Sequence, residues 1–170
     1  MRQYLLWLMN RATHSGFHRW LLNLVLWKVI PFNRPHRFWI TRIQPGSIEI
    51  RMPYRRRNFN HIRGLHACGL ATAAEYATGL LLLMRVDPAR YRLIMQNLNV
   101  TYHYQAKTTA YARFDISEDW LVENLVTPLQ RETSVLVKPN VSVFDQNDNL
   151  VCEATLSWQV KDWQQVRTRV

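Results

Sequence analysis

The sequence predicts an α+β fold in which an antiparallel sheet wraps around one long, buried helix. Residues 65–84 are almost entirely small or apolar, and a helix that is apolar on all sides is a buried helix. The second half of the chain alternates apolar and polar residues, most regularly over residues 98–106 and 150–160, which is typical of half-buried strands. A curved sheet can cover most of the circumference of such a helix, so both observations fit one domain.

The N-terminal part, residues 1–34, predicts an amphipathic helical segment ahead of a main domain that we expect to span residues 35–165. Its apolar run over residues 17–32 is interrupted by four polar or basic residues: His18, Arg19, Asn23 and Lys28. No stretch therefore reaches the roughly 18 apolar residues of a spanning helix, and no cleavage site of a signal peptide is evident. We expect the segment to pack on the domain or on a partner subunit. The alternative is a membrane interface, where Trp and basic side chains are common.

The main domain begins with two predicted strands, Phe38–Ile43 and Ser47–Met52, joined by a turn at Pro45-Gly46. An arginine-rich loop then leads into the predicted helix, from about residue 65 to residue 84. Asp87-Pro88 ends that helix, because proline cannot continue the hydrogen-bonding pattern.

The remainder of the chain predicts strands with one short helix. Apolar side chains occupy even positions over residues 98–106, whereas Leu93 and Met95 are on the odd phase, so we expect a β-bulge near residues 96–97. Residues 110–116 alternate in the same way, and Ser117 can cap a short helix after them. We expect one strand over residues 135–143, a turn at 146–149 and a final strand over 150–160.

Glu75 is the only charged residue between residues 65 and 84. An unpaired carboxylate inside a buried helix is costly, so it is either hydrogen-bonded or kept with a raised pKa for acid and base chemistry. Asn60, His61 and His66 stand just before the helix, near the free backbone amides of its first turn. This combination predicts an active site.

The net charge of +10, from 22 Lys and Arg against 12 Asp and Glu, favours an anionic partner. Five arginines crowd the approach to the helix: Arg51, Arg55, Arg56, Arg57 and Arg63. They form either a solvated basic loop or a phosphate clamp, because guanidinium groups suit bidentate phosphate contacts. Nucleic acid is not the expected partner, because no helix-turn-helix, zinc or base-stacking motif accompanies the charge.

The two cysteines, Cys68 and Cys152, lie within apolar segments and have neither metal-ligand spacing nor the pattern of a disulfide framework. We therefore predict no metal site and a reducing, cytoplasmic setting, with or without peripheral membrane contact through residues 1–34.

Asn60, His66 and Glu75 also carry a family resemblance. An Asn, a His-Gly-Gly six residues later at the start of a helix, and an Asp or Glu nine residues further on are typical of the PaaI-like acyl-CoA thioesterases. Together with the element order over residues 37–161, this spacing resembles that branch of the hotdog-fold superfamily. The chain has His66-Ala67-Cys68 where the pattern has His-Gly-Gly, which is similar to a sub-branch with His-Ala at this point.

The resemblance implies hydrolysis of acyl-CoA or acyl-carrier-protein thioesters. The backbone amide of Ala67 would stabilise the oxyanion, and Glu75 would act as general base or nucleophile. Asn60 would hold the water or the carbonyl oxygen, and His66 would orient the thioester. Coenzyme A would enter as part of the substrate, without any other cofactor, and its phosphates would contact arginines of the loop: Arg55, Arg56, Arg57 and Arg63.

Helical geometry indicates that His66 and Glu75 cannot share a site within one chain. Nine residues correspond to about 13.5 Å of rise and about 900° of rotation, which puts the two side chains on opposite sides of the helix. The resemblance implies a homodimer, or a tetramer of two dimers, in which His66 of one subunit lies beside Glu75 of the other.

Each site residue also has a non-catalytic interpretation. Glu75 could hydrogen-bond a buried amide across a dimer, His66 could serve only to start the helix, and Asn60 could be an ordinary loop or capping residue. The alternative function is therefore a non-catalytic acyl-binding or membrane-associated protein that keeps the hotdog fold.

Overall fold

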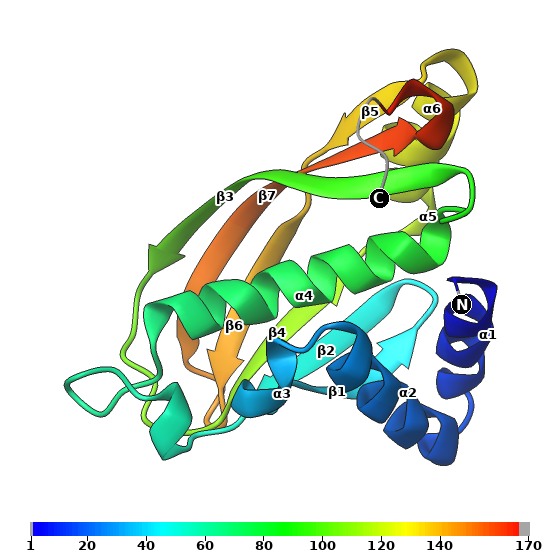
Figure 1. Ribbon diagram of the computed structural model, residues 1–170. Helices are drawn as coiled ribbons and strands as arrows, with labels where there is room; N and C mark the ends of the chain where they lie inside the picture. Colours follow the sequence, from blue (N-terminus) through cyan, green and yellow to red (C-terminus); the bar gives the residue numbers. More distant parts are fainter. Residues whose placement is uncertain (1, 167–170) are drawn as a thin grey trace.

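The computed structural model describes residues 2–166, which form a seven-stranded antiparallel sheet curved around one long helix (Figure 1). The strands follow the order β1-β2-β4-β6-β7-β3, with β5 paired to β7 beyond the end of β6. Their bounds are Trp39–Gln44 (β1), Ser47–Met52 (β2), Tyr91–Tyr102 (β3), Ala110–Asp115 (β4), Ser134–Val137 (β5), Asn140–Asp145 (β6) and Leu150–Asp162 (β7).

The long helix α4, Ala67–Arg85, is the predicted core helix and lies across the sheet (Figure 1). Most of its circumference is buried, but one stripe is only half-buried: Ala71, Thr72, Glu75, Gly79 and Leu83. These positions recur every three or four residues, so a single face of α4 is incompletely covered. Among the described helices, only α4 has the length and apolar composition of a membrane span, a property it shares with core helices of soluble proteins.

Packing between α4 and β7 is close at Gly79 and Trp158. A Cβ atom on Gly79 would come within 2.9 Å of the Trp158 ring, so the missing side chain makes room for that ring. The buried Trp158 indole Nε1–H donates to the Thr78 hydroxyl at 3.0 Å. This bond fixes the rotation of α4 relative to β7.

The strand predictions hold with two corrections. The expected bulge is confirmed, because the register between β3 and β7 shifts between Met95 and Asn97. The alternation over residues 98–106 overstated the strand, since β3 ends at Tyr102. The single strand expected over residues 135–143 is wrong. It divides at Lys138-Pro139 into β5 and β6, which pair in series with the long strand β7.

The N-terminal segment forms three helices: α1 (Arg2–Ala12), α2 (Gly16–Val29) and α3 (Asn33–His36). The inner faces of α1 and α2 belong to the hydrophobic core through Leu8, Met9, Ala12, Leu22 and Leu26. The expectation that this segment packs on the domain is therefore confirmed for these faces. In Figure 1, α1 and α2 lie beside β1, at the end of the sheet opposite β3.

Asn23 joins α2 to the edge of the sheet. Its side-chain amide accepts from the Ile40 N–H at 2.7 Å and donates to the Ile40 carbonyl at 3.1 Å. The buried Asn23 side chain thus forms hydrogen bonds to both backbone groups of Ile40, as a neighbouring strand would. It covers an edge of the sheet that would otherwise be open to pairing with another strand.

Between β4 and β5 the chain forms α5 (Glu118–Leu121), a π-helical turn (Val122–Val126) and α6 (Thr127–Arg131). The Ser117 hydroxyl accepts from the Trp120 N–H at 3.1 Å, which confirms the predicted cap. Two short 3₁₀ turns complete the described chain, Arg56–Asn58 and Trp163–Gln165.

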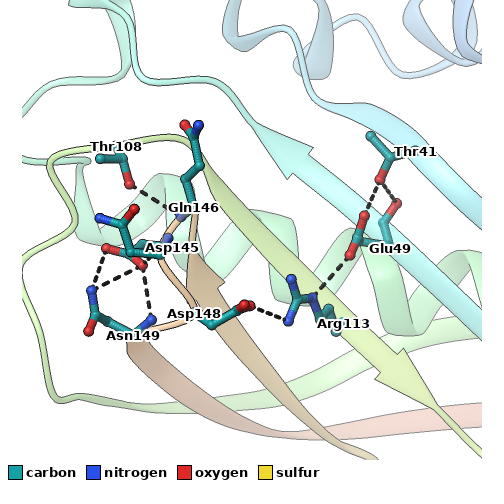
Figure 2. A network of polar contacts seen from close by, with 9 residues as sticks. Thr41, Glu49, Thr108, Arg113, Asp145, Gln146, Asp148 and Asn149 are labelled. Carbon is teal, nitrogen blue, oxygen red and sulfur yellow. Dashed lines mark hydrogen bonds and ion pairs between the residues drawn. The ribbon is translucent and has the colours of Figure 1, made fainter.

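A polar network covers the side of β1, β2 and β4 that faces away from α4 (Figure 2). The Arg113 guanidinium bridges Glu49 at 3.0 Å and Asp148 at 2.8 Å, and the Thr41 hydroxyl donates to Glu49 at 2.6 Å. Asp145 accepts from the backbone amides of Asn147 and Asn149, at 2.8 Å and 3.0 Å, and closes the turn after β6. The predicted turn at residues 146–149 is therefore confirmed, and this face serves structure.

Candidate active site at the start of α4

The loop between β2 and α4 is held in place by Asn58, a buried residue that the sequence interpretation did not single out. Its side-chain amide donates to the carbonyls of Pro53, at 2.8 Å, and His36, at 3.0 Å. Its Oδ1 lies 3.0 Å from His36 Nδ1, and its backbone carbonyl accepts from the His66 N–H at 2.8 Å. Asn58 therefore fixes the position of the residue that begins the helix.

His66 caps the N-terminus of α4. Its Nδ1 accepts from the Cys68 N–H at 3.2 Å, so the neutral ring carries its proton on Nε2. The Ala67 N–H belongs to the first turn and cannot bond within the helix, and no hydrogen bond from it occurs among residues 2–166. A free amide and an imidazole N–H therefore stand together where the helix dipole favours negative charge.

An apolar cavity of about 260 Å³ lies beside this helix start. It is lined by residues from the N-terminal segment, the loop and α4: Phe32, His36, Phe38, Met52, Arg57, Asn58, Phe59, His66, Cys68, Gly69 and Thr72. A Cβ atom on Gly69 would collide with the end of the Met52 side chain, so this glycine lets β2 approach the helix. The cavity brings His66 next to a space that an apolar ligand could fill.

Glu75 lies on the half-buried face of α4, less than one turn beyond Thr72 of the cavity lining and about 2.5 turns from His66. Burial raises the pKa of its carboxyl above the ordinary value of 4.5. Within residues 2–166, no hydrogen bond or ion pair reaches that carboxylate. Glu75 is therefore a carboxyl group with a raised pKa on an incompletely covered face, and no side chain in the described part of the chain bonds to it.

Asn60 stabilises the loop. Its Oδ1 accepts from the N–H groups of Ile62 and Gly64, at 3.1 Å and 2.9 Å, and its backbone pairs with Gly64. Its oxygen is thus committed to the turn that precedes His66, whereas His61 is exposed at the tip. The structure brings Asn60 into the same loop as His66 but not into the lining of the apolar cavity.

The arginines divide between two places. Arg55 and Arg57 line an open basic cavity of about 810 Å³ together with residues of the N-terminal segment: Leu24, Trp27, Lys28, Arg34, Pro35 and Arg37. Arg56 lines a neighbouring surface cavity with the same two arginines, whereas Arg63 lies outside these cavities, at a left-handed φ of 60°. Arg57 lines both the basic and the apolar cavity, so the two adjoin.

The sequence did not reveal that residues 28–37 contribute to this site. Lys28, Arg34, His36 and Arg37 carried no motif, and only folding of the N-terminal segment against the loop brings them to the cavities. A metal centre finds no support in the same region, since no three His, Cys, Asp or Glu side chains converge within the described part of the chain.

Comparison with known proteins places the chain in a family. A family model described as "Domain of unknown function (DUF4442)" matches residues 18–160. The chain belongs to this family. No curated protein matches it.

Solved structures resemble the chain over most of its length. A Pseudomonas aeruginosa protein of unknown function, called a probable thioesterase, has a TM-score of 0.76 at 22% identity, covering 84% of this chain and 94% of its own. A Staphylococcus aureus thioesterase has a TM-score of 0.63 at 14% identity, covering 77% and 98% respectively. A Haemophilus influenzae thioesterase has a TM-score of 0.62 at 13% identity, covering 81% and 87%. At these identities the likeness shows the fold alone, and the hotdog fold implied by the sequence is confirmed.

Proposed function

We propose that the protein hydrolyses acyl thioesters of coenzyme A or of acyl carrier protein. The observation that carries this proposal is the start of α4, where the unpaired Ala67 N–H and the His66 ring adjoin an apolar cavity. The similar structures called thioesterases support the same reaction. An apolar cavity suits an acyl chain or pantetheine arm, and a helix N-terminus suits the negative oxygen that forms when a thioester is attacked.

In this reaction water attacks the thioester carbonyl carbon, the C–S bond breaks, and the products are a carboxylic acid and a thiol. The Ala67 N–H would donate to the developing oxyanion, assisted by the dipole of α4. His66, whose Nδ1 is occupied by Cys68, would direct its Nε2–H at the thioester. A Cβ atom at Ala67 leaves the amide available, so the replacement of His-Gly-Gly by His66-Ala67-Cys68 preserves the donor.

Glu75 would remove the proton from the attacking water, or attack the carbonyl carbon itself. Its raised pKa fits a base, and its position on the half-buried face of α4 fits a residue that serves a second subunit. Asn60 would contribute its Nδ2 amide, because its Oδ1 already accepts two bonds within the loop.

The proposed partner is a second copy of the chain, joined through β3. This 12-residue strand pairs with β7 on one side, forms the other end of the sheet, and exposes Ile94 and Met95. A long, open edge with apolar side chains is a template for pairing with another chain. Antiparallel pairing about a two-fold axis would set two α4 helices in opposite directions, which brings His66 of one subunit toward Glu75 of the other.

The basic cavity would take the phosphates of coenzyme A. Arg55, Arg56 and Arg57 project from one loop, and Arg57 also borders the apolar cavity, so a single extended ligand could occupy both. Arg63 stays a prediction from the same loop. Carrier protein, whose prosthetic group has one phosphate, would use fewer of these contacts.

Thiol release from a panel of short-, medium- and long-chain and aryl acyl-CoAs, measured for wild type and Glu75→Gln, tests the proposal. We expect turnover by the wild type and a fall of at least about a hundredfold in Glu75→Gln, the scale of a lost general base. Turnover that survives the substitution would reject Glu75 but keep the enzyme. Binding of acyl-CoA without turnover would favour the second candidate function, a non-catalytic acyl-binding protein. The observation that favours this candidate is the presence of Ala67-Cys68 where the thioesterase pattern has Gly-Gly.

A further inference from the structure

The outer faces of α1 and α2 carry aromatic side chains that the core does not use. On α1, Tyr4 and Trp7 are exposed, on the side away from the buried Met9. On α2, Phe17, Trp20 and Leu24 follow one another at helical spacing on the side opposite Leu22 and Leu26. Phe17 is 66% exposed and Trp20 is 49% exposed, so large apolar surfaces face solvent.

These rings form one continuous surface across both helices. Tyr4 stacks on Trp7 with centroids 5.6 Å apart, Trp7 meets the edge of His18 at 5.8 Å, and Phe17 stacks on Trp20 at 6.0 Å. His18 also contacts Phe17 at 5.8 Å, which closes the connection. We call this set, Tyr4, Trp7, Phe17, His18 and Trp20, the aromatic surface.

The N-terminal stretch that carries the aromatic surface has charges of one sign only. No Asp or Glu occurs before Glu49, whereas this stretch contains seven basic residues: Arg2, Arg11, Arg19, Lys28, Arg34, Arg37 and Arg42. The Arg11 guanidinium lies over the Trp7 ring, 5.7 Å from its centroid. Within the described chain no carboxylate forms an ion pair with Arg11, Arg19, Lys28 or Arg34. Leu24 then connects the aromatic surface to the basic cavity, which it lines with Lys28 and Arg34.

We propose that the aromatic surface of α1 and α2 docks the protein onto an anionic lipid bilayer. Indole and phenol rings settle at the boundary between headgroups and acyl chains, and neighbouring Lys and Arg side chains are attracted to anionic headgroups. No acid occurs before Glu49, so the helices that carry the surface add no negative charge of their own. Anchoring of Asn23 and the core leucines to the domain keeps the two helices in place, so docking needs no unfolding.

The end of α2 leads from the docking surface toward the candidate active site. Phe32 follows α2, is 60% exposed, and lines the apolar cavity beside His66. Leu24 on the outer face of α2 lines the basic cavity, and Arg57 lines both that cavity and the apolar one, so a bilayer bound at α2 would border the basic cavity first. The docking itself does not depend on the proposed hydrolysis, because none of the five aromatic-surface residues lines the cavity.

Co-sedimentation of the full chain with vesicles tests the proposal. We expect binding to phosphatidylcholine vesicles that contain phosphatidylglycerol, weaker binding to phosphatidylcholine alone, and weakening by added NaCl. The double variant Phe17→Ser/Trp20→Ser should lower the vesicle affinity at least about tenfold, because binding scales with buried apolar area. Arg11→Gln/Arg19→Gln should reduce the preference for anionic vesicles.

The matched control is Val122→Ser/Leu136→Ser, which removes two exposed apolar side chains from a different region and should bind as the wild type does. Circular dichroism and thermal melting verify that all variants are folded. Equal binding by wild type and Phe17→Ser/Trp20→Ser, or no binding of wild type to any vesicle, would overturn the proposal. Oligomers that dissociate in the same variant, without vesicle binding, would assign the surface to a second copy and also overturn it.

Discussion

Glu75 is the candidate site residue that the sequence singles out most clearly. It stands out because no other charge occurs over residues 65–84, and the structure places it on the half-buried face of α4, where burial raises its pKa. Asn58 and Asn23 had no comparable signal. Their bonds to His36 and Ile40 join residues 22 and 17 positions apart, and only the folded chain reveals such pairs.

The raised pKa of Glu75 predicts a stability that depends on pH. Because its folded pKa exceeds 4.5, the folded state binds this proton more tightly than the unfolded state does. The stabilisation is therefore complete below about pH 4.5 and is lost as the pH rises through the folded pKa. We expect Glu75→Gln to melt at a higher temperature than wild type at neutral pH, and the difference to shrink toward pH 4.5.

Thermal melts of wild type, Glu75→Gln and Glu132→Gln across this pH range check the prediction. Glu132 is exposed, so its substitution serves as the control and should leave the melting curve almost unchanged. A neutral-pH wild type as stable as Glu75→Gln would show that the assembled protein provides the carboxylate with a partner.

The buried hydrogen bond between Trp158 and Thr78 predicts how substitutions of Thr78 change the stability of the fold. Thr78→Val removes the acceptor for the Trp158 Nε1–H and leaves that donor buried and unsatisfied, at a cost of about 1–3 kcal/mol. Thr78→Ser keeps the hydroxyl and should lose much less. Urea denaturation followed by tryptophan fluorescence measures both variants, and a loss in Thr78→Ser as large as that in Thr78→Val would contradict the dominant role of the hydroxyl.

At the scale of elements, the periodicity of apolar residues predicted most of the strands. It failed where the pairing between strands determines where a strand ends. The bulge at residues 96–97 was visible as a change of phase, because each side chain must face its proper side of the sheet. The division between β5 and β6 was not visible, because the valines keep their alternation across Lys138-Pro139. Pro139 lacks an N–H and accepts from Leu156 instead, so the chain changes pairing position along β7 there.

Asn23 adds a buried polar attachment of α2 to the sheet, beside the apolar packing of the N-terminal helices. Asn23→Leu removes both bonds to Ile40 and leaves its backbone N–H and carbonyl without their partner, so we expect a loss of about 1–3 kcal/mol. Amide hydrogen exchange should show faster exchange at Ile40. Asn10→Leu, at an exposed position of α1, is the control and should leave the Ile40 amide protected.

At the scale of the whole molecule, one edge of the sheet is covered and the other is open. At one end Asn23 and α2 cover β1, whereas at the other end β3 is open and exposes apolar side chains. This asymmetry favours a dimer through β3, since pairing there leaves both copies of α1 and α2 free on the outside. A dimer of this kind and a docked membrane surface are thus compatible.

The proposed composite site yields a prediction that single variants cannot test. His66→Ala and Glu75→Gln should each be nearly inactive as homodimers, because each lacks one half of both sites. If His66 of one subunit works with Glu75 of the other, a mixed dimer has one site with both changes and one site with neither.

Equal amounts of the two variants, unfolded together and refolded, should therefore regain about a quarter of wild-type turnover, since random pairing makes half of the dimers mixed. Size-exclusion chromatography checks that dimers have formed, and each variant refolded alone is the control. If both residues act within one chain, every site in the mixture keeps one defect and turnover stays at the level of the separate variants, which would rule out the shared site while leaving the dimer intact.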